Sequence, residues 1–442
     1  DTVTRKEWMT DLKATYELDQ EDMSMLPEEF FSDPEATATR EFAATTVNYF
    51  IGFELNQSLG YSFTDAADVT DKDSAEYAVK KNLLALKDGD VFSPDTPITV
   101  AEKDSMLEAA KHIWESQYSM VDTYGEDAIG AARLIVDNDL TGGARHTLYI
   151  PKKLNGKTVK YISSGAFQNN TDISFVKIPN TVTGIEAKAF NGCTGLGGTL
   201  TIPEQVTEMG SRAFGNCTNI TKVIIPVDFK YANSQEPFYG CTGVTEIHYT
   251  YGQTGIMRDV YGYISNDSGN YYSSRLEYST RNSLKTVSFE EGITKIGSGA
   301  YFNAYDSSNT YPCTKLKTVI LPASLTEIGA NAFKRCTALN YIKLPNGFTT
   351  LGEGCFMECT SLFTSDSPDE TMTLEDIGMP ANVSNIPRDC FSGCTGLGGT
   401  LTIPDQITTL DGNAFKGCTG INKVIIPVDF KYTKGQEPFN GW

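Results

Sequence analysis

The stretch LPASLTEIGANAFKRCTALNYIKLP, residues Leu321–Pro345, decides the fold. Its last part, LNYIKLP, alternates apolar and other side chains, which indicates a short strand, and the proline ends that strand because it cannot donate to a ladder. LTEIG predicts a second short extended piece before a glycine turn. ANAFKRC places Ala332, Phe333 and Cys336 on one side of a helical turn. One such unit cannot bury its apolar side alone, so we expect stacked units about 4.8 Å apart.

The unit recurs from about residue 131 to residue 442, and prolines mark its period. Successive prolines lie 23 residues apart (226 − 203) or 24 residues apart (203 − 179). The pairs that show this spacing are Pro179 and Pro203, Pro203 and Pro226, Pro322 and Pro345, Pro380 and Pro404, and Pro404 and Pro427. A fixed period of this length predicts a solenoid with a parallel strand ladder.

The ten cysteines follow the same period, and none precedes Cys193. No Cys-x-x-Cys pair occurs, so the common zinc and redox motifs are missing. Eight cysteines occupy the slot three residues after the repeat phenylalanine or its equivalent, whereas Cys355 and Cys390 occupy the alanine slot before Phe356 and Phe391. Buried free thiols behave as small apolar groups, so we predict a thiol ladder in the core. A disulfide between neighbouring units stays open as an alternative.

The repeats resemble a known family. IPNTVTGIEAKAFNGCTGL and IPDQITTLDGNAFKGCTGI look like BspA-like bacterial leucine-rich repeats, and IPKKLNGKTVKYISSGAF (Ile150–Phe167) is similar to that family's opening repeat. The resemblance covers about residues 131–442. It implies a right-handed leucine-rich-repeat solenoid on a secreted or cell-surface protein, with a role in adhesion or binding rather than catalysis.

The first 130 residues differ from the repeats in composition and pattern, with helical spacing of apolar residues, many acidic residues and no cysteine. Residues Ser62–Ile113 resemble an S-layer homology repeat, and Phe30–Phe50 and Val3–Leu18 look like parts of two further copies. That resemblance implies binding of cell-wall polysaccharide through the arginine of a Thr-Arg-Ala-Glu motif, here Arg5 and Arg40. A third copy of the motif lacks the arginine. The alternative is a degenerate helical module that caps the solenoid.

These patterns predict a multidomain α+β protein. Its parts are a small helical domain over residues 1–130 and a solenoid over residues 131–442, with a Tyr/Ser/Asn-rich insertion at about residues 250–283. The net charge of −20 and the pI near 4.6 argue against nucleic acid and anionic membranes as partners. No apolar run is long enough to insert into a membrane. The chain begins with Asp1 and carries no signal peptide, so we expect that a leader was removed and that the protein is secreted or at the cell surface.

The sequence offers no catalytic constellation. The three histidines, His112, His146 and His248, lie in different regions and outside any zincin or triad-like context. The glycine pair of CTGLGGT precedes a strand and has no following lysine, unlike a phosphate loop. We therefore predict no catalytic residue, no metal and no cofactor. A carbohydrate-active enzyme remains the less favoured alternative.

The same glycine pair occurs twice, inside a duplicated block. Residues 190–240 and 391–441 align without gaps and differ at 16 of 51 positions, so their likeness reflects duplication. The distance from cysteine to proline is one residue longer in the units with the glycine pair than in the following ones. We therefore predict bulges at Gly197-Gly198 and Gly398-Gly399, where glycine can take a positive φ.

Two candidate binding surfaces follow. Alternation along the ladder strands points one set of side chains outward, and its candidate ligand-binding residues are Phe175, Lys177, Lys222, His248, Tyr341 and Lys343. Phe175, Tyr341 and Lys343 are the best anchors, because aromatic residues dominate interface energies. The alternative for this face is a solvated, threonine-rich sheet surface. The insertion has the composition of adaptable recognition loops and contains Tyr261, Tyr263, Tyr271 and Tyr272. Its alternative is a disordered or self-packed insert.

The resulting hypothesis is a non-catalytic, secreted or cell-surface binding or adhesion protein. It presents the solenoid to a host or bacterial surface protein or glycan, and the N-terminal module holds it to cell-wall polysaccharide. The alternative function is a structural cell-wall or S-layer component in which the solenoid is a spacer.

Overall fold

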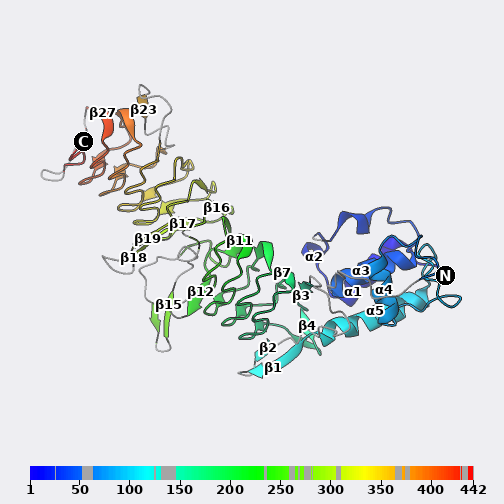
Figure 1. Ribbon diagram of the computed structural model, residues 1–442. Helices are drawn as coiled ribbons and strands as arrows, with labels where there is room; N and C mark the ends of the chain where they lie inside the picture. Colours follow the sequence, from blue (N-terminus) through cyan, green and yellow to red (C-terminus); the bar gives the residue numbers. More distant parts are fainter. Residues whose placement is uncertain are drawn as a thin grey trace. The chain divides into compact units, whose positions relative to one another are not determined.

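The computed structural model describes most of the chain in two compact units, Asp1–Val182 and Thr183–Trp442. The described residues are 1–24, 26–51, 63–123, 126–130, 146–232, 236–257, 264–266, 269–272, 280, 282–304, 310–363, 371–373, 379–428, 430 and 437–441. The domain boundary expected near residue 130 stays a prediction. Figure 1 shows helices in the first unit and stacked short strands in the second.

The helices of the first unit begin at sequence-encoded caps. Thr4 caps α1 and Thr99 caps α5, and each forms a capping box with the glutamate three residues later, Glu7 and Glu102. The threonine and glutamate of the Thr-Arg-Lys-Glu motif therefore hold a helix start. The helices are α1 (Arg5–Thr15), α2 (Gln20–Ser24), the 3-10 helix η1 (Glu28–Phe31), α3 (Arg40–Ile51), α4 (Lys72–Lys80) and α5 (Val100–Ser116).

Short strands follow these helices in the same unit. Trp114 on α5 and Tyr118 both donate to the backbone oxygen of Tyr149, at 2.9 and 2.6 Å, so the end of the helix is tied to the first ladder strand. β3 (His146–Tyr149) pairs in parallel with β7 (Ile173–Lys177), and β2 (Glu126–Gly130) pairs in parallel with β6 (Tyr161–Ile162). Two antiparallel pairs join β2 to β1 (Ser119–Thr123), and β4 (Lys153–Leu154) to β5 (Lys157–Thr158).

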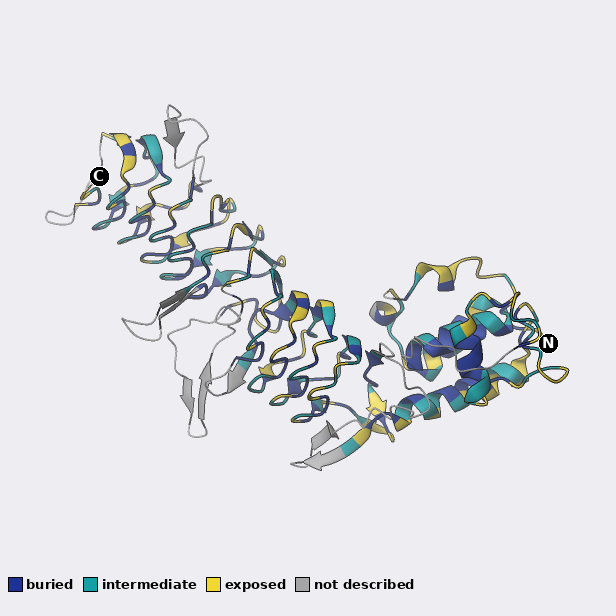
Figure 2. Cartoon of the chain, in the orientation of Figure 1, coloured by how far each residue is buried: buried dark blue, intermediate teal, exposed yellow. Residues whose placement is uncertain are grey.

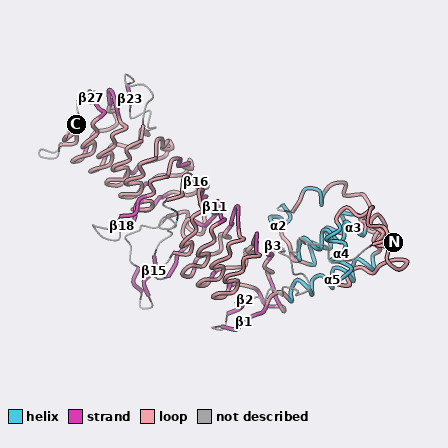
Figure 3. Tube along the Cα trace, in the orientation of Figure 1, coloured by secondary structure: helices cyan, strands magenta, loops and turns pink. Residues whose placement is uncertain are grey.

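The second unit is the predicted solenoid with parallel ladders (Figure 3). The longer strands are β9 (Gly197–Thr201), β11 (Asn219–Pro226), β13 (Glu246–Thr250), β16 (Thr286–Phe289), β20 (Thr318–Ile320), β23 (Thr371–Thr373), β25 (Gly398–Thr402) and β27 (Gly420–Ile425). The second ladder uses shorter strands: β8 (Gly184–Ile185), β10 (Glu208–Met209), β12 (Lys230–Ala232), β17 (Lys295–Ile296), β21 (Glu327–Ile328), β22 (Thr350–Leu351), β24 (Asn385–Ile386) and β26 (Thr409–Leu410).

The irregular segments also contain strands. The long insertion contributes a hairpin of β14 (Ile264–Asn266) and β15 (Gly269–Tyr272), and β15 extends the second ladder by antiparallel pairing with β12. The smaller insertion near residue 305 forms a hairpin of β18 (Phe302–Ala304) and β19 (Thr310–Pro312). β23 at Thr371–Thr373 pairs in parallel with β25.

An aromatic ring and a thiol recur in the buried core of successive rungs. Phenylalanine and tyrosine rings stack along the unit with centroids 4.9–5.7 Å apart and planes within 16°. The thiol of Cys217 donates to the backbone oxygen of Phe190 in the preceding rung at 3.2 Å, and the same bond recurs along the ladder. All ten cysteines are buried and free, which confirms the predicted thiol ladder. Figure 2 shows the buried strip that these rungs form.

The predicted helical turn is wrong in one respect, because ANAFKRC forms tight turns. Asn331 and Arg335 have positive φ values of 53° and 59°. The N–H groups of Asn331, Phe333 and Arg335 donate to oxygens of the next rung at 2.8 Å each. A right-handed helix needs negative φ values at every residue, so the turns that aim these N–H groups at the next rung cannot belong to a helix.

The glycine-pair bulges are confirmed, with one correction. Gly198 and Gly399 have φ values of 66° and 68°, and the strand register shifts directly after each. In the two strand pairings, Thr221 of β11 and Asn422 of β27 have no partner residue on the glycine-containing strand. The unpaired residue therefore lies on the neighbouring strand and not on the strand with the glycines.

Candidate functional site

The outward side chains of the longer ladder form the candidate site, which we call the strand face. It comprises the outward side chains of β9, β11, β13, β16 and β20 together with Tyr341 and Lys343. Lys222 pairs in register with Glu246, Glu246 with Thr286, and Thr286 with Thr318, and Tyr341 bridges to Thr318. The intervening valines and isoleucines are buried, so the alternation expected from the sequence holds in this unit.

Polar contacts occupy the first half of the strand face. The ammonium of Lys222 lies 2.5 Å from Glu246 Oε1, and both side chains are about one-third exposed. His248 Nδ1 lies 2.8 Å from Ser288 Oγ. Such half-exposed pairs contribute little to stability and leave these polar groups partly satisfied. The predicted ligand contacts of Lys222 and His248 stay predictions.

The second half of the strand face is basic and apolar. Ile320 and Tyr341 are 55% and 53% exposed, although they lie on neighbouring strands of an otherwise well-packed ladder. Three exposed lysines lie on these rungs or the one before: Lys343 follows Tyr341 by two residues, and Lys317 and Lys285 directly precede β20 and β16. The backbone N–H of Lys317 donates to the oxygen of Lys285 at 2.9 Å, which fixes the two lysines in adjacent rungs. We call these five residues the basic patch.

No carboxylate neutralises the basic patch among the described residues. Its three lysines form no ion pair there, and the outward strand positions next to them are Thr286, Ser288 and Thr318. The sequence prediction included Tyr341 and Lys343 but missed the other three patch residues. The sequence contained a signal for two of them, because Lys285 and Lys317 each directly precede a ladder strand at equivalent repeat positions. A net charge of −20 for the whole chain conceals such a local cluster.

Phe175 and Lys177 lie apart from the patch, in the first unit. The Phe175 ring packs 6.1 Å from that of Tyr149. Lys177 is nearly buried, and its ammonium lies 3.8 Å from Asp22. Lys152 binds the same acidic cluster, 2.7 Å from Asp19 and 2.9 Å from Asp22. These contacts give Lys177 a structural role, and its predicted ligand contact stays untested.

Asp19 of this acidic cluster stays ionised as a carboxylate. Burial opposes ionisation of Asp19, but hydrogen bonds from Lys152 and from the backbone N–H of Asp22 outweigh burial and lower its pKa to about 2. The cluster thus joins α2 to the strands of the first unit over a wide pH range.

The tyrosines of the insertion are only partly placed. Tyr261 and Tyr263 lie outside the described residues. The backbone of Tyr271 pairs with Ile264 and Ala232, and that of Tyr272 pairs with Tyr231. Recognition by this insertion stays a prediction.

The two arginines predicted to bind glycan differ in environment. Arg40 is 1% exposed and donates to the backbone oxygens of Phe92 and Ala85, at 2.8 and 2.5 Å, and to Glu102 at 3.1 Å. Arg5 is half-buried, lies over the Phe42 ring and donates to the Ser32 oxygen at 3.2 Å. Its partial exposure leaves Arg5 the better placed of the two for a ligand, and glycan binding stays a prediction for both.

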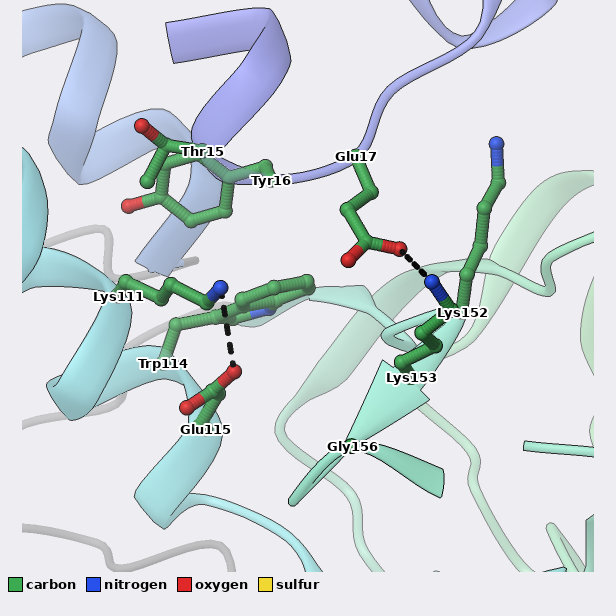
Figure 4. Close-up of a pocket in the computed structure, with 9 residues that line it drawn as sticks. All are labelled: Thr15, Tyr16, Glu17, Lys111, Trp114, Glu115, Lys152, Lys153 and Gly156. Carbon is green, nitrogen blue, oxygen red and sulfur yellow. Dashed lines mark ion pairs between the residues drawn. The ribbon is translucent and has the colours of Figure 1, made fainter. Parts of the chain in front are cut away.

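A small cavity of about 150 Å³ lies in the first unit (Figure 4). Trp114 and Tyr16 form one wall, and both side chains are buried. Ion pairs occupy its rim: Lys111 lies 3.8 Å from Glu115, and Lys153 lies 3.5 Å from Glu17. Ligand pockets are usually at least twice this volume and mainly apolar, so the cavity does not compete with the strand face as a site.

The described residues offer few side-chain groups for catalysis. They contain no group of three His, Cys, Asp or Glu side chains that could hold a metal ion. Among the described helices, none combines the length and apolarity that crossing a membrane requires. The thiols are poor nucleophiles, because burial raises the pKa of Cys336 and Cys394 well above the usual range and that of Cys418 to about 12.

Because the thiols are buried, we predict that the free energy of unfolding falls at alkaline pH. In reducing buffer, thiols of the unfolded chain ionise near pH 8.5, whereas the buried ones stay protonated. The native state then holds more protons than the unfolded state, so the free energy of unfolding falls as the pH rises from about 8.5, and for Cys418 the fall continues to about pH 12. Each buried thiol contributes up to about 1.4 kcal/mol per pH unit.

Urea midpoints at pH 7.5 and pH 10 measure this effect, and Cys418→Ala is the comparison. The variant should lose less stability between the two pH values than the parent chain, because one titrating group is gone. An equal loss in both proteins contradicts the assignment.

The fold and the strand face together define a class: a parallel repeat solenoid that presents a strand surface. The family model described as BspA type Leucine rich repeat region matches six copies, over residues 160–273, 277–376 and 369–440. The chain belongs to this leucine-rich repeat family. The model begins at residue 160, so the resemblance of the N-terminal region to S-layer homology repeats stays a prediction.

Solved structures of bacterial leucine-rich repeat proteins are also similar to this chain. A leucine rich cell surface protein from Faecalibacterium prausnitzii is 23% identical, with 70% of this chain and 74% of that chain covered and a TM-score of 0.32. A leucine-rich repeat protein from Bacteroides ovatus is 18% identical, with coverages of 71% and 88% and a TM-score of 0.29. No curated protein matches the chain.

Proposed function

We propose that this protein is a non-catalytic binding protein, secreted or held at the cell surface. The strand face takes a segment of a partner protein, and the basic patch selects an acidic segment. The observation that carries the proposal is the pair of half-exposed side chains, Ile320 and Tyr341, beside lysines that have no ion-pair partner among the described residues.

The composition of the basic patch supports this kind of partner. Tyrosine is enriched among the few residues that dominate interface energies, and an aliphatic neighbour extends the apolar centre. Isoleucine favours a protein side chain over a sugar ring, since sugars stack on aromatic faces. Charges act over about 8–10 Å at physiological ionic strength, so the lysines attract carboxylates locally although the whole chain is acidic.

The test is a binding screen with the whole chain against surface proteins and glycans, followed by variants. Tyr341→Ala should weaken the best ligand about tenfold or more, as expected for an interface anchor. Lys317→Glu should weaken it severalfold and flatten its dependence on salt, because charge attraction to the partner is lost.

Lys416→Glu is the matched control, since it makes the same charge change on an exposed residue of a turn away from the strand face. A ligand that tolerates both patch variants, or that is affected equally by Lys416→Glu, contradicts the proposal. A glycan as the best ligand contradicts the choice of an acidic protein segment.

Attachment to the cell wall is a separate proposal, in which Arg5 contacts wall polysaccharide. It is supported by the S-layer homology resemblance and by the partial exposure of Arg5. A co-sedimentation assay with purified wall compares the whole chain with Arg5→Ala, and equal retention of both proteins contradicts it. Strong wall retention together with an empty ligand screen would instead favour the spacer function.

A further inference from the structure

The solenoid has a joint at which the ladder of shorter strands is interrupted. In the described residues, β22 ends one short-strand sheet and β24 begins another. The longer ladder is divided one rung earlier, between Tyr341 and β23, and it continues across this joint from β23 to β25. Two rungs meet here, and their turn segments carry Cys355 and Cys390.

The two rungs stay connected through the pairing of β23 with β25 and through their turn segments. The N–H groups of Gly354, Phe356 and Glu358 donate across the joint to backbone oxygens, at 2.9, 3.0 and 2.7 Å. The rings of Phe356 and Phe391 stack at 5.6 Å. Between β22 and β24 the described residues lack the pairing that joins other short strands, so opening this side of the joint should cost less than opening a fully paired rung.

The two cysteines outside the thiol ladder face each other across this joint. Cys355 Sγ lies 3.3 Å from Cys390 Sγ, and both side chains are fully buried. The ladder cysteines of the same rungs behave differently, because Cys359 and Cys394 donate to backbone oxygens at 3.0 and 3.1 Å. Other rungs place alanine in the slot of Cys355, such as Ala332, which is also fully buried.

We propose that Cys355 and Cys390 form an oxidative cross-link that closes the joint. The oxidant is a low-molecular-weight disulfide, such as oxidised glutathione. One cysteine thiolate attacks it and releases one small thiol, which gives a mixed disulfide. The second thiolate then displaces the second small thiol, so two protein thiols are oxidised, the small disulfide is reduced to two thiols, and the two protons lost by the protein thiols end on the two small thiols.

The reaction takes place while the joint is open, during folding or in a local opening. Neither cysteine is accessible in the closed rung. Burial also raises the pKa of Cys390 well above its usual range, so thiolate forms only when water reaches the site. Closing the rung then brings the two sulfurs together.

The experiment refolds the whole chain with oxidised and reduced glutathione, alkylates free thiols and maps the peptides by mass spectrometry. We expect one cross-linked peptide pair containing Cys355 and Cys390, with a loss of two hydrogens, and alkylation of the other cysteines after denaturation. The bond closes a loop of 35 residues, and the melting temperature should exceed that of the reduced protein by roughly 5–10 °C.

Matched variants separate the cross-link from a packing effect. Cys355→Ala restores the usual residue of the slot and should abolish the difference between oxidised and reduced protein, whereas Cys359→Ala should keep it. Cys390→Ala replaces the first variant if that one fails to fold. Free, alkylated Cys355 and Cys390 after oxidative refolding, or their pairing with ladder cysteines, overturn the proposal, and peptide mapping of the parent chain decides this without any variant.

Discussion

Replacing Phe333 by alanine should lower the free energy of unfolding by about 3–5 kcal/mol. The ring is fully buried and stacks between Tyr301 at 5.1 Å and Phe356 at 5.7 Å. Rung spacing is set by backbone hydrogen bonds, such as that from Phe333 N–H to the Cys355 oxygen at 2.8 Å. The neighbouring rings therefore cannot close the cavity, and the substitution loses both transfer free energy and ring contacts.

Thermal and urea unfolding measure this loss, and hydrogen exchange locates it. In a repeat array each rung depends on its neighbours, so protection should fall first in the rungs beside Phe333. Tyr341→Ala is the control, because it removes an aromatic ring that is 53% exposed. It should change stability by less than about 1 kcal/mol. Similar losses in both variants would show that the aromatic stack does not hold the rungs.

The second large effect concerns Arg40. Its replacement by alanine should cost about 2–4 kcal/mol, because the backbone oxygens of Phe92 and Ala85 lose a charged donor inside the first unit. Glu102 is 30% exposed on its side chain and can turn to water, so its contribution is smaller. Arg40→Lys should recover little, since one ammonium cannot replace the forked contacts of the guanidinium.

Arg5→Ala provides the comparison within the same motif. The Arg5 side chain is half-buried and donates through one nitrogen to Ser32, so its loss should cost less than about 1 kcal/mol. Circular dichroism and thermal melts of the whole chain give both values. Equal destabilisation by the two variants would contradict the distinction between a structural and a peripheral arginine.

The repeat period carried most of the fold prediction. Proline spacing, alternation and the cysteine slot led to a parallel solenoid, and the thiol ladder, the inward valines and the glycine-pair bulges follow from them. The predicted helical turn was wrong because ANAFKRC has helix-compatible spacing, and only a neighbouring rung competes for its N–H groups. Strand β23 was not predicted, because Thr371–Thr373 has no proline boundary at the usual distance.

The candidate site was predicted less completely. Alternation identified the outward rows, and the aromatic criterion selected Tyr341. The aromatic criterion did not group Lys285 and Lys317 with Tyr341. These residues come from three rungs, and the irregular segments make the sequence distances between those rungs unequal. Burial of Lys177 and Arg40 depends on groups far away in the chain, the Asp22 carboxylate and the Phe92 backbone oxygen, and no local pattern reports such contacts.

The sequence by itself determined the architecture, since a unit that cannot bury its apolar side alone must stack, and the repeat sets how it stacks. It also determined the capped helix starts, because Thr4 and Glu7 satisfy each other's backbone within one turn. Only the tertiary structure decided which outward residues stay exposed, which charges are neutralised, and which two thiols of ten face each other. Those properties depend on the register between rungs. Register is set by the pairing of segments that lie far apart in the sequence, and neither segment specifies it alone.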